Sequence, residues 1–341
     1  MNIDKQSSDM AWWREAQNAR DERVAWWQDA RFGMFVHWNA SSQLGGVWRD
    51  KVYSGYTEHI QRLATIPCEV YREEVVGVFN PTEFDADRWI KAAKSAGMRY
   101  FIITAKHHDG FAMFDSDASD YNILDATLFG RDPMKELKEA CERHDIRFGF
   151  YYSHAFDWGE PNGAGNDWDY DNPGGSQLLH GGRNWYDKNP HLVPKFRTYV
   201  DQKAIPQVVE LIEKHDPDIL WFDTAAKLPP EECLRVLKAA REVGPDVVIN
   251  SRIVQYTGHG NYGDYLSTVD RPADFHPVSE DWEAIPTTNE SYGWSANDES
   301  YKPSLFFIRL LAKAAVVSVK MRTFVFGVNP AGRSAPNSVA A

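Results

Sequence analysis

Polar and titratable residues recur directly after the apolar strands that the sequence predicts. Five such segments follow one another along the chain: His37-Trp38, Lys106-His107-His108-Asp109, Tyr151-Tyr152, Trp221-Phe222-Asp223 and Asn250-Ser251-Arg252. If these strands are parallel, their carboxyl ends meet on one face, and barrel enzymes build their active sites on that face. Five occurrences in succession favour one functional site over five separate structural roles.

The carboxylate that comes after a wholly apolar run is the most informative of these groups. Asp223 stands directly after residues 219–222, Ile-Leu-Trp-Phe, and burying a charge there without a purpose is costly. Taken alone, Asp223 would equally fit a cap for the next helix. At a barrel mouth, however, it can act as the nucleophile toward an anomeric carbon. Three tryptophans are candidates for stacking on a sugar face: Trp38, Trp48 and Trp221.

A metal-dependent hydrolase is an alternative interpretation of the same residue types. His37, His107, His108 and Asp223 are all potential metal ligands. That class usually carries an H-x-H on its first strand, whereas this chain has only one histidine there. The three cysteines are too far apart in the sequence for a zinc ribbon. We therefore predict neither a metal nor another cofactor.

The elements that must position these side chains alternate between strands and helices. Six continuous apolar runs predict strands at 31–38, 99–106, 146–152, 218–223, 247–250 and 323–328. Helical patterns occupy 10–30, 85–97, 132–144, 203–214, 230–243 and 303–319. Such alternation predicts a parallel sheet buried on both faces, and the number of units favours an α/β fold of the (β/α)8 barrel type. No G-x-G-x-x-G follows a strand, which disfavours a dinucleotide site. We expect the remaining two strands within 255–300, so the barrel should be irregular in its later units.

Composition excludes several classes of protein. The 341 residues are 43% hydrophobic and 25% charged, which fits one catalytic barrel domain over 1–341 with an N-terminal helix. The net charge of −12 disfavours nucleic acid as a partner, and no apolar stretch is long enough to span a membrane. The N-terminus lacks the apolar region of a signal peptide, so we expect a cytoplasmic location, or a secreted or periplasmic one if a signal was removed.

Several longer motifs carry a family resemblance. The chain resembles the α-L-fucosidases of glycoside hydrolase family 29, in order and over nearly its whole length. The most specific segments are A-K-H-H-D-G-F-A-M-F-D-S at 105–116 and D-P-D-I-L-W-F-D at 216–223. Supporting segments are W-W-Q-D-A-R-F-G-M-F-V-H-W (26–38), Y-T-E-H-I (56–60), F-N-P-T-E-F-D-A-D-R-W (79–89), R-F-G-F-Y-Y-S (147–153) and W-E-A-I-P-T-T-N-E-S-Y-G-W (282–294).

The resemblance implies roles for individual residues. Asp223 would be the nucleophile of a retaining, metal-independent glycosidase, and Glu58 would bind a sugar hydroxyl. The fucose subsite would be lined by His37, His107, His108, Tyr152 and Trp221. For the general acid/base, Glu283 in D-W-E matches one family position, and Asp270 is the alternative because many relatives have a glutamate there.

Some features depart from the family pattern. His59 stands where relatives usually carry tryptophan, which affects the outer sugar subsite, and the last strand lacks the usual Gly-Gly-Asn run before it. The chain also ends soon after that strand, so we expect a barrel without the C-terminal β-sandwich that many relatives have.

Taken together, the sequence predicts a retaining exo-α-L-fucosidase that removes terminal α-L-fucose from a fucosylated glycan. Asp223 would attack the anomeric carbon while Glu283 protonates the leaving oxygen and later activates water. Two alternatives remain at this stage. They are a catalytically silent fucose-binding barrel, suggested by the departures from the family pattern, and the metal-dependent hydrolase described above.

Overall fold

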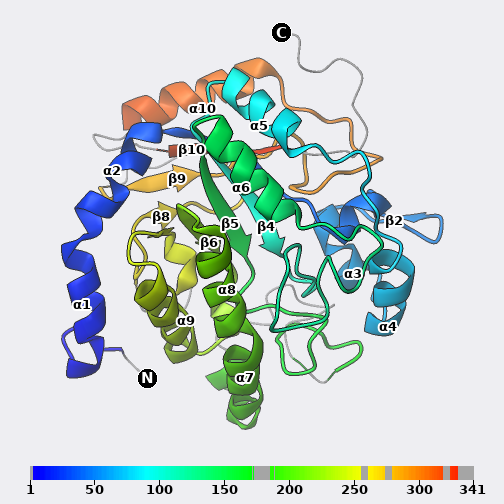
Figure 1. Ribbon diagram of the computed structural model, residues 1–341, viewed down its shortest axis with the longest axis horizontal. Helices are drawn as coiled ribbons and strands as arrows, with labels where there is room; N and C mark the ends of the chain where they lie inside the picture. The colour runs from blue at the N-terminus through cyan, green and yellow to red at the C-terminus, as the bar shows by residue number, and fades with distance from the viewer. Residues whose placement is uncertain are drawn as a thin grey trace.

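Eight parallel strands form the centre of the computed structural model, which describes residues 3–170, 172, 185–187, 189–254, 260–272, 279–317 and 323–328. The strands are β1 (Phe32–Val36), β4 (Tyr100–Lys106), β5 (Arg147–Tyr152), β6 (Ile219–Phe222), β7 (Val248–Ile249), β8 (Leu266–Ser267), β9 (Trp282–Ala284) and β10 (Thr323–Val328). They pair in the order β7-β6-β5-β4-β1-β10-β9-β8. A parallel bridge between Asn250 and Tyr265 joins the two ends of this sheet. The closed ring, in chain order, is the predicted (β/α)8-type barrel (Figure 1).

Helices cover the outside of this barrel (Figure 1). They are α5 (Ala86–Ser95), α6 (Pro133–Arg143), α7 (Val193–Tyr199), α8 (Ile205–His215), α9 (Pro230–Val243) and α10 (Ser304–Val317). Their starts reflect local chemistry: Asp132 accepts hydrogen bonds from the backbone N–H groups of Met134 and Lys135, and Pro133 occupies the first turn of α6. None of the described helices is long and apolar enough to cross a membrane.

The barrel is irregular where the sequence pattern is least regular. Between β7 and β8 the described residues contain only a single 3-10 turn, Ser251–Ile253, and no α-helix is described between β8 and β9. The six apolar runs did not include the last two strands of the barrel to be located. These are β8 and β9, and they lie within 255–300 as predicted. Each has only two or three residues and contains a polar one, Ser267 in β8 and Glu283 in β9, so neither forms a continuous apolar run.

Smaller elements extend the loops and the N-terminus. The predicted helix over 10–30 is two helices, α1 (Ala11–Asn18) and α2 (Arg20–Ala30), which break at Ala19. After β1 come the hairpin of β2 (Val47–Trp48) and β3 (Lys51–Val52) and the short helices α3 (Ile60–Leu63) and α4 (Cys68–Tyr71).

Strand alternation separates two apolar cores. Side chains that face the barrel interior pack with each other and with α2, whose Trp27 stacks on Tyr265 with ring centroids 4.2 Å apart. The interior set includes Phe35, Ile102, Tyr151, Ile219, Trp221 and Val248. Their neighbours along each strand face the surrounding helices instead. Because α2 packs near the strand starts, the carboxyl ends remain available for a site.

Candidate active site

A pocket of about 480 Å³ lies at the carboxyl ends of the strands. Seven residues that the sequence analysis singled out for function line it: His37, Glu58, His107, His108, Trp221, Asp223 and Asp270. They come from the ends of β1, β4, β6 and β8 and from the 3-10 turn Thr57–His59. The structure thus brings together most of the side chains that the strand-end pattern indicated.

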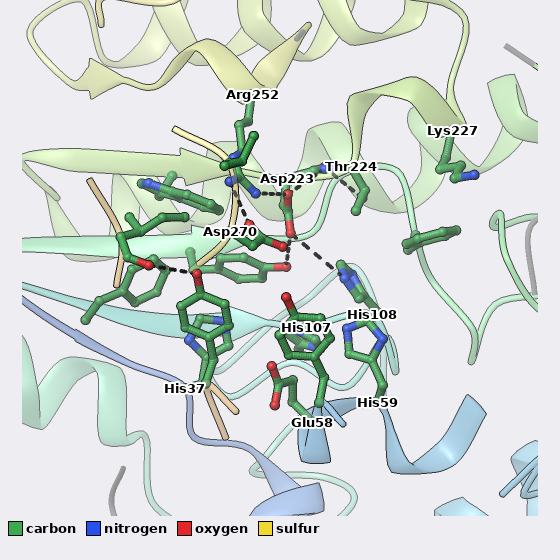
Figure 2. Close-up of a pocket in the computed structure, with 18 of the residues that line it drawn as sticks. His37, Glu58, His59, His107, His108, Asp223, Thr224, Lys227, Arg252 and Asp270 are labelled. Atoms are coloured by element: carbon green, nitrogen blue, oxygen red, sulfur yellow. Dashed lines mark hydrogen bonds and ion pairs between the residues drawn. The ribbon is translucent and has the colours of Figure 1, made fainter. Parts of the chain in front are cut away.

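Asp223 lies in the middle of the pocket, between Arg252 and His108 (Figure 2). Its Oδ1 accepts from Arg252 Nη1 at 3.0 Å and from the Thr224 backbone N–H at 2.9 Å. Its Oδ2 accepts from the Tyr151 hydroxyl at 3.0 Å. Burial raises the pKa of Asp223, and Arg252 opposes this. Three donors on one carboxylate stabilise its ionised form and fix its direction.

Arg252 binds a second carboxylate in the same pocket. Its Nη2 donates to Asp270 Oδ1 at 2.7 Å, so a single guanidinium bridges Asp223 and Asp270. The Asp270 side chain is 43% exposed, whereas Arg252 is 4% exposed. Burial tends to raise the pKa of Asp270, but the charge and hydrogen bond of Arg252, together with the nearby His59 and His37, make the net shift downward. Of the two carboxylates that Arg252 bridges, Asp223 is therefore the inner one and Asp270 the outer one.

The pocket histidines are neutral at ordinary pH. Burial lowers the pKa of His37 to about 3 and those of His107 and His108 well below the usual value. Ser153 Oγ donates to the Phe156 carbonyl, so it accepts from His108 Nδ1 at 2.7 Å. The Nε2 atom of His108 therefore carries the lone pair. Neutral imidazoles both donate to and accept from hydroxyl groups.

Glu58 lies on the opposite side of the pocket from Arg252 (Figure 2). Its Oε2 accepts from Ser291 Oγ and from the Gly293 backbone N–H, both at 2.8 Å. Burial raises the pKa of Glu58. These contacts fix the carboxyl group where it can accept from a ligand hydroxyl.

Aromatic rings supply the apolar part of the pocket. Trp221 stacks on Tyr151, with centroids 5.4 Å apart and an interplanar angle of 21°. The Arg252 guanidinium lies 4.8 Å from the centroid of the Trp221 ring. A sugar needs such a flat apolar surface together with polar groups.

Three predicted sugar-binding residues do not line the pocket. Trp38 packs in the core between strands and helices, where it stacks on Phe84 with ring centroids 4.9 Å apart. Tyr152 packs on the outside of β5, where its hydroxyl donates to Gln207 on α8 at 2.9 Å. Successive side chains of a strand point to opposite faces, so Tyr151 points inward and lines the pocket. The prediction that Tyr152 lines the pocket is therefore wrong by one residue. Trp48 lies in the β2–β3 hairpin, outside the residues that line the pocket.

Glu283 occupies a position that does not suit the predicted acid/base role. It lies on β9, is fully buried and is not among the pocket residues. Its Oε1 accepts from Trp221 Nε1 at 2.5 Å and from Ser267 Oγ. Side chains that face the barrel interior lie in layers, so Ile285, directly after β9, reaches the pocket while Glu283 on β9 lies one layer deeper. Burial raises the pKa of Glu283 to about 7.

Sequence reasoning assigned no role to several residues that line the pocket. Arg252 and Tyr151 stood in the strand-end segments, but nothing in the sequence showed which member of each segment faced inward. Lys227 lay in no quoted motif, and Tyr292 stood in the supporting segment 282–294 without an assigned role. His59 was noted only as a departure, and it faces His108 with ring centroids 5.1 Å apart.

Among the described residues, His59, His107 and His108 form a group whose nitrogen ligand atoms lie within 4.8 Å of one another. The metal-dependent alternative from the sequence used His37, His107, His108 and Asp223 as ligands. The group in the structure shares His107 and His108 with that set but contains His59 where the set had His37.

Comparisons with known proteins point to one family. The alpha-L-fucosidase family profile matches residues 2–331. The plasma alpha-L-fucosidase of Homo sapiens is 26% identical over 322 residues, which cover 89% of this chain and 62% of that protein. The chain therefore spans less than two thirds of this curated relative.

Solved structures show the same likeness. The alpha-L-fucosidase from Vibrio sp. strain EJY3 superposes with a TM-score of 0.79 at 31% identity, covering 91% of this chain and 52% of that one. The unliganded enzyme from Lactobacillus casei gives 0.76 at 33% identity, covering 93% and 94%. Structures of the Lactobacillus casei enzyme also exist with α-L-fucose product.

Proposed function

This chain belongs to the alpha-L-fucosidase family, and we propose on that premise that it hydrolyses terminal α-L-fucosides of glycans with retention of configuration. The observation that carries the proposal is the position of Asp223, a carboxylate fixed by three donors in a pocket lined with neutral imidazoles and aromatic rings. The barrel and α2 would form one domain, because Trp27 of α2 packs in the barrel core.

The sugar fits the pocket through its hydroxyls and its apolar face. The Nδ1 atoms of His37 and His107 are buried without a hydrogen-bond partner among the described residues. A buried polar atom of this kind is costly unless a ligand satisfies it. Hydroxyls of fucose would pair with these imidazoles and with Glu58, while Trp221 would pack against its apolar surface.

In the first step, the Asp223 carboxylate attacks the anomeric carbon and the bond to the leaving oxygen breaks. Arg252, Tyr151 and Thr224 hold the carboxylate ionised and directed into the pocket. The product of this step is a fucosyl ester of Asp223, which water then hydrolyses.

For the acid/base we propose Asp270, the alternative in the sequence prediction, in place of Glu283. Asp270 lines the pocket and shares Arg252 with Asp223, whereas Glu283 lies below Trp221. A general acid must be protonated when substrate binds. Exclusion of water by the leaving sugar raises the pKa of Asp270 toward that state, and fucosylation of Asp223 then removes the neighbouring negative charge. The lowered pKa of Asp270 suits its later role as the base.

Release of the phenol from an activated aryl α-L-fucoside tests this proposal directly. We expect turnover with net retention at the anomeric carbon, followed by NMR. Binding of fucose without turnover would instead favour the silent sugar-binding barrel.

A further inference from the structure

Three imidazoles converge on one side of the pocket, beside the nucleophile. His59 comes from the turn before α3, and His107 and His108 follow β4 (Figure 2). The His107 and His108 ring centroids are 4.2 Å apart, and those of His59 and His107 are 5.7 Å apart. All three rings are buried, and their ligand atoms lie within 4.8 Å of one another.

The hydrogen bonds of His108 leave the correct nitrogen available for a metal. Its Nδ1–H donates to Ser153, so the lone pair is on Nε2. This anchoring of one imidazole nitrogen by a polar partner is the usual arrangement around a metal-bound histidine. His107 also retains a buried Nδ1 without a partner among the described residues.

Asp223 is in reach as a fourth ligand. Its Oδ2 lies 4.0 Å from His108 Nε2. Three imidazoles and one carboxylate are a ligand set that suits Zn²⁺, Co²⁺ or Ni²⁺. Zinc–nitrogen bonds of about 2.0–2.1 Å require ligand atoms about 3.3 Å apart. The ligand atoms, which lie within 4.8 Å of one another, would therefore have to approach one another by up to about 1.5 Å when the ion binds.

We propose that His59, His107 and His108, completed by Asp223, bind a divalent transition metal ion that inhibits this enzyme. Binding of the ion is independent of the proposed function, and only the inhibition rests on it. The ion would engage the nucleophile and occupy space that the sugar needs. No step of the hydrolysis described above uses the metal.

Arg62 disfavours metal binding at this site, and replacing it tests the proposal. Its Nη2 lies 3.5 Å from His59 Nδ1. An arginine only donates, so this contact favours the tautomer of His59 with its proton on Nε2. Arg62→Gln removes the charge and offers a carbonyl oxygen to a proton on Nδ1, whereas Arg62→Met removes the charge only. We expect zinc to bind more tightly to both variants, and most tightly to Arg62→Gln.

The experiment uses the full chain after treatment with a chelator. Zn²⁺ is titrated by calorimetry and Co²⁺ by visible absorption, because tetrahedral Co²⁺ gives strong d–d bands. We expect one ion per chain and competition by L-fucose. His59→Phe should weaken binding at least tenfold and remove the cobalt bands. The control is His144→Ala, which removes a partly exposed histidine bonded to Asp87 and should change neither result.

Activity provides a second measurement. Zinc should inhibit aryl fucoside hydrolysis, and the inhibitory concentration should rise at least tenfold in His59→Phe relative to that variant's own activity. EDTA should not lower the activity of the unaltered enzyme. Wild-type zinc affinity in folded His59→Phe would overturn the site, as would equal affinities in the two Arg62 variants and the unaltered chain. Zinc binding at His59 in a chain without fucosidase activity would overturn the proposed function alone.

Discussion

Asp223, Asp270 and Glu283 have different surroundings in the barrel, and these surroundings suit them to different chemical roles. Asp223 accepts from three donors inside the pocket, and Asp270 shares Arg252 with it while remaining partly exposed. Glu283 bonds to an indole and a hydroxyl in the barrel interior. A nucleophile needs a fixed ionised carboxylate, and a general acid/base needs access to the leaving group and to water. Only the first two positions meet these needs.

Replacement of the nucleophile should abolish turnover without unfolding the chain. In Asp223→Gly we expect kcat to fall by several orders of magnitude, because the covalent intermediate cannot form. Azide should restore part of the activity with an aryl fucoside and yield a fucosyl azide of inverted configuration, detectable by NMR. Wild-type turnover in this variant would exclude Asp223 as the nucleophile.

Replacement of the acid/base should have an effect that depends on the leaving group. Asp270→Ala should hardly slow fucosylation by a substrate with an acidic phenol, because such a group leaves without protonation. It should strongly slow cleavage of a fucosyl-sugar, and the basic limb of the pH profile should flatten. Glu283→Ala is the matched comparison, measured with the same two substrates. If Glu283→Ala shows the leaving-group dependence and Asp270→Ala does not, the two roles must be exchanged.

At the scale of the element, the sequence predicts where strands lie better than which side chains face inward. The five residues of β5 after Arg147 are apolar or aromatic, and all five are buried, so both faces of the strand are covered. A period of two is invisible when both faces are buried, so Tyr151 and Tyr152 could not be distinguished. β9 is too short to show from its sequence how deep Glu283 lies. The break at Ala19 is not marked by glycine or proline.

Glu283 should make stability depend on pH through β9. Its pKa is about 7 in the folded chain, above that of an exposed glutamate. The contribution of Glu283 to stability is therefore fully present below the unfolded pKa of about 4.3 and is lost as pH rises through the folded pKa of about 7, by about 4 kcal/mol. Glu283→Gln keeps an acceptor for Trp221 but cannot ionise. The variant should match the unaltered chain near pH 4.5 and exceed its free energy of unfolding by up to about 4 kcal/mol at pH 8. Denaturant unfolding at both pH values measures this, and a difference that does not grow with pH would contradict it.

At the scale of the whole molecule, the motifs predicted the barrel and its active face because those depend on long apolar runs and on the residues directly after each strand. The closure of the barrel could not be predicted in the same way. It depends on contacts between residues far apart in the chain, of which Asp264 is the centre. Asp264 accepts from Arg23 of α2 at 2.7 Å, from Arg241 of α9 at 2.6 Å and from the Ile249 N–H of β7 at 2.8 Å.

This buried network should stabilise the entire chain, because it joins α2, β7 and α9 where the barrel closes without a covering helix. Asp264→Asn leaves two buried guanidinium groups without their counter-charge, so we expect a loss of about 3–5 kcal/mol in the free energy of unfolding. The control is Asp21→Asn, which removes an exposed partner of Arg20 and should change stability by no more than about 0.5 kcal/mol.

The arginines lower the pKa of Asp264 against the effect of burial. The contribution of ionised Asp264 to the free energy of unfolding is therefore fully present above its unfolded pKa of about 3.9 and is lost as pH falls through its lower folded pKa. Asp264→Asn cannot ionise, so its stability should not show this loss. Equal unfolding free energies for the two variants at neutral pH would mean that the barrel closes without help from Asp264.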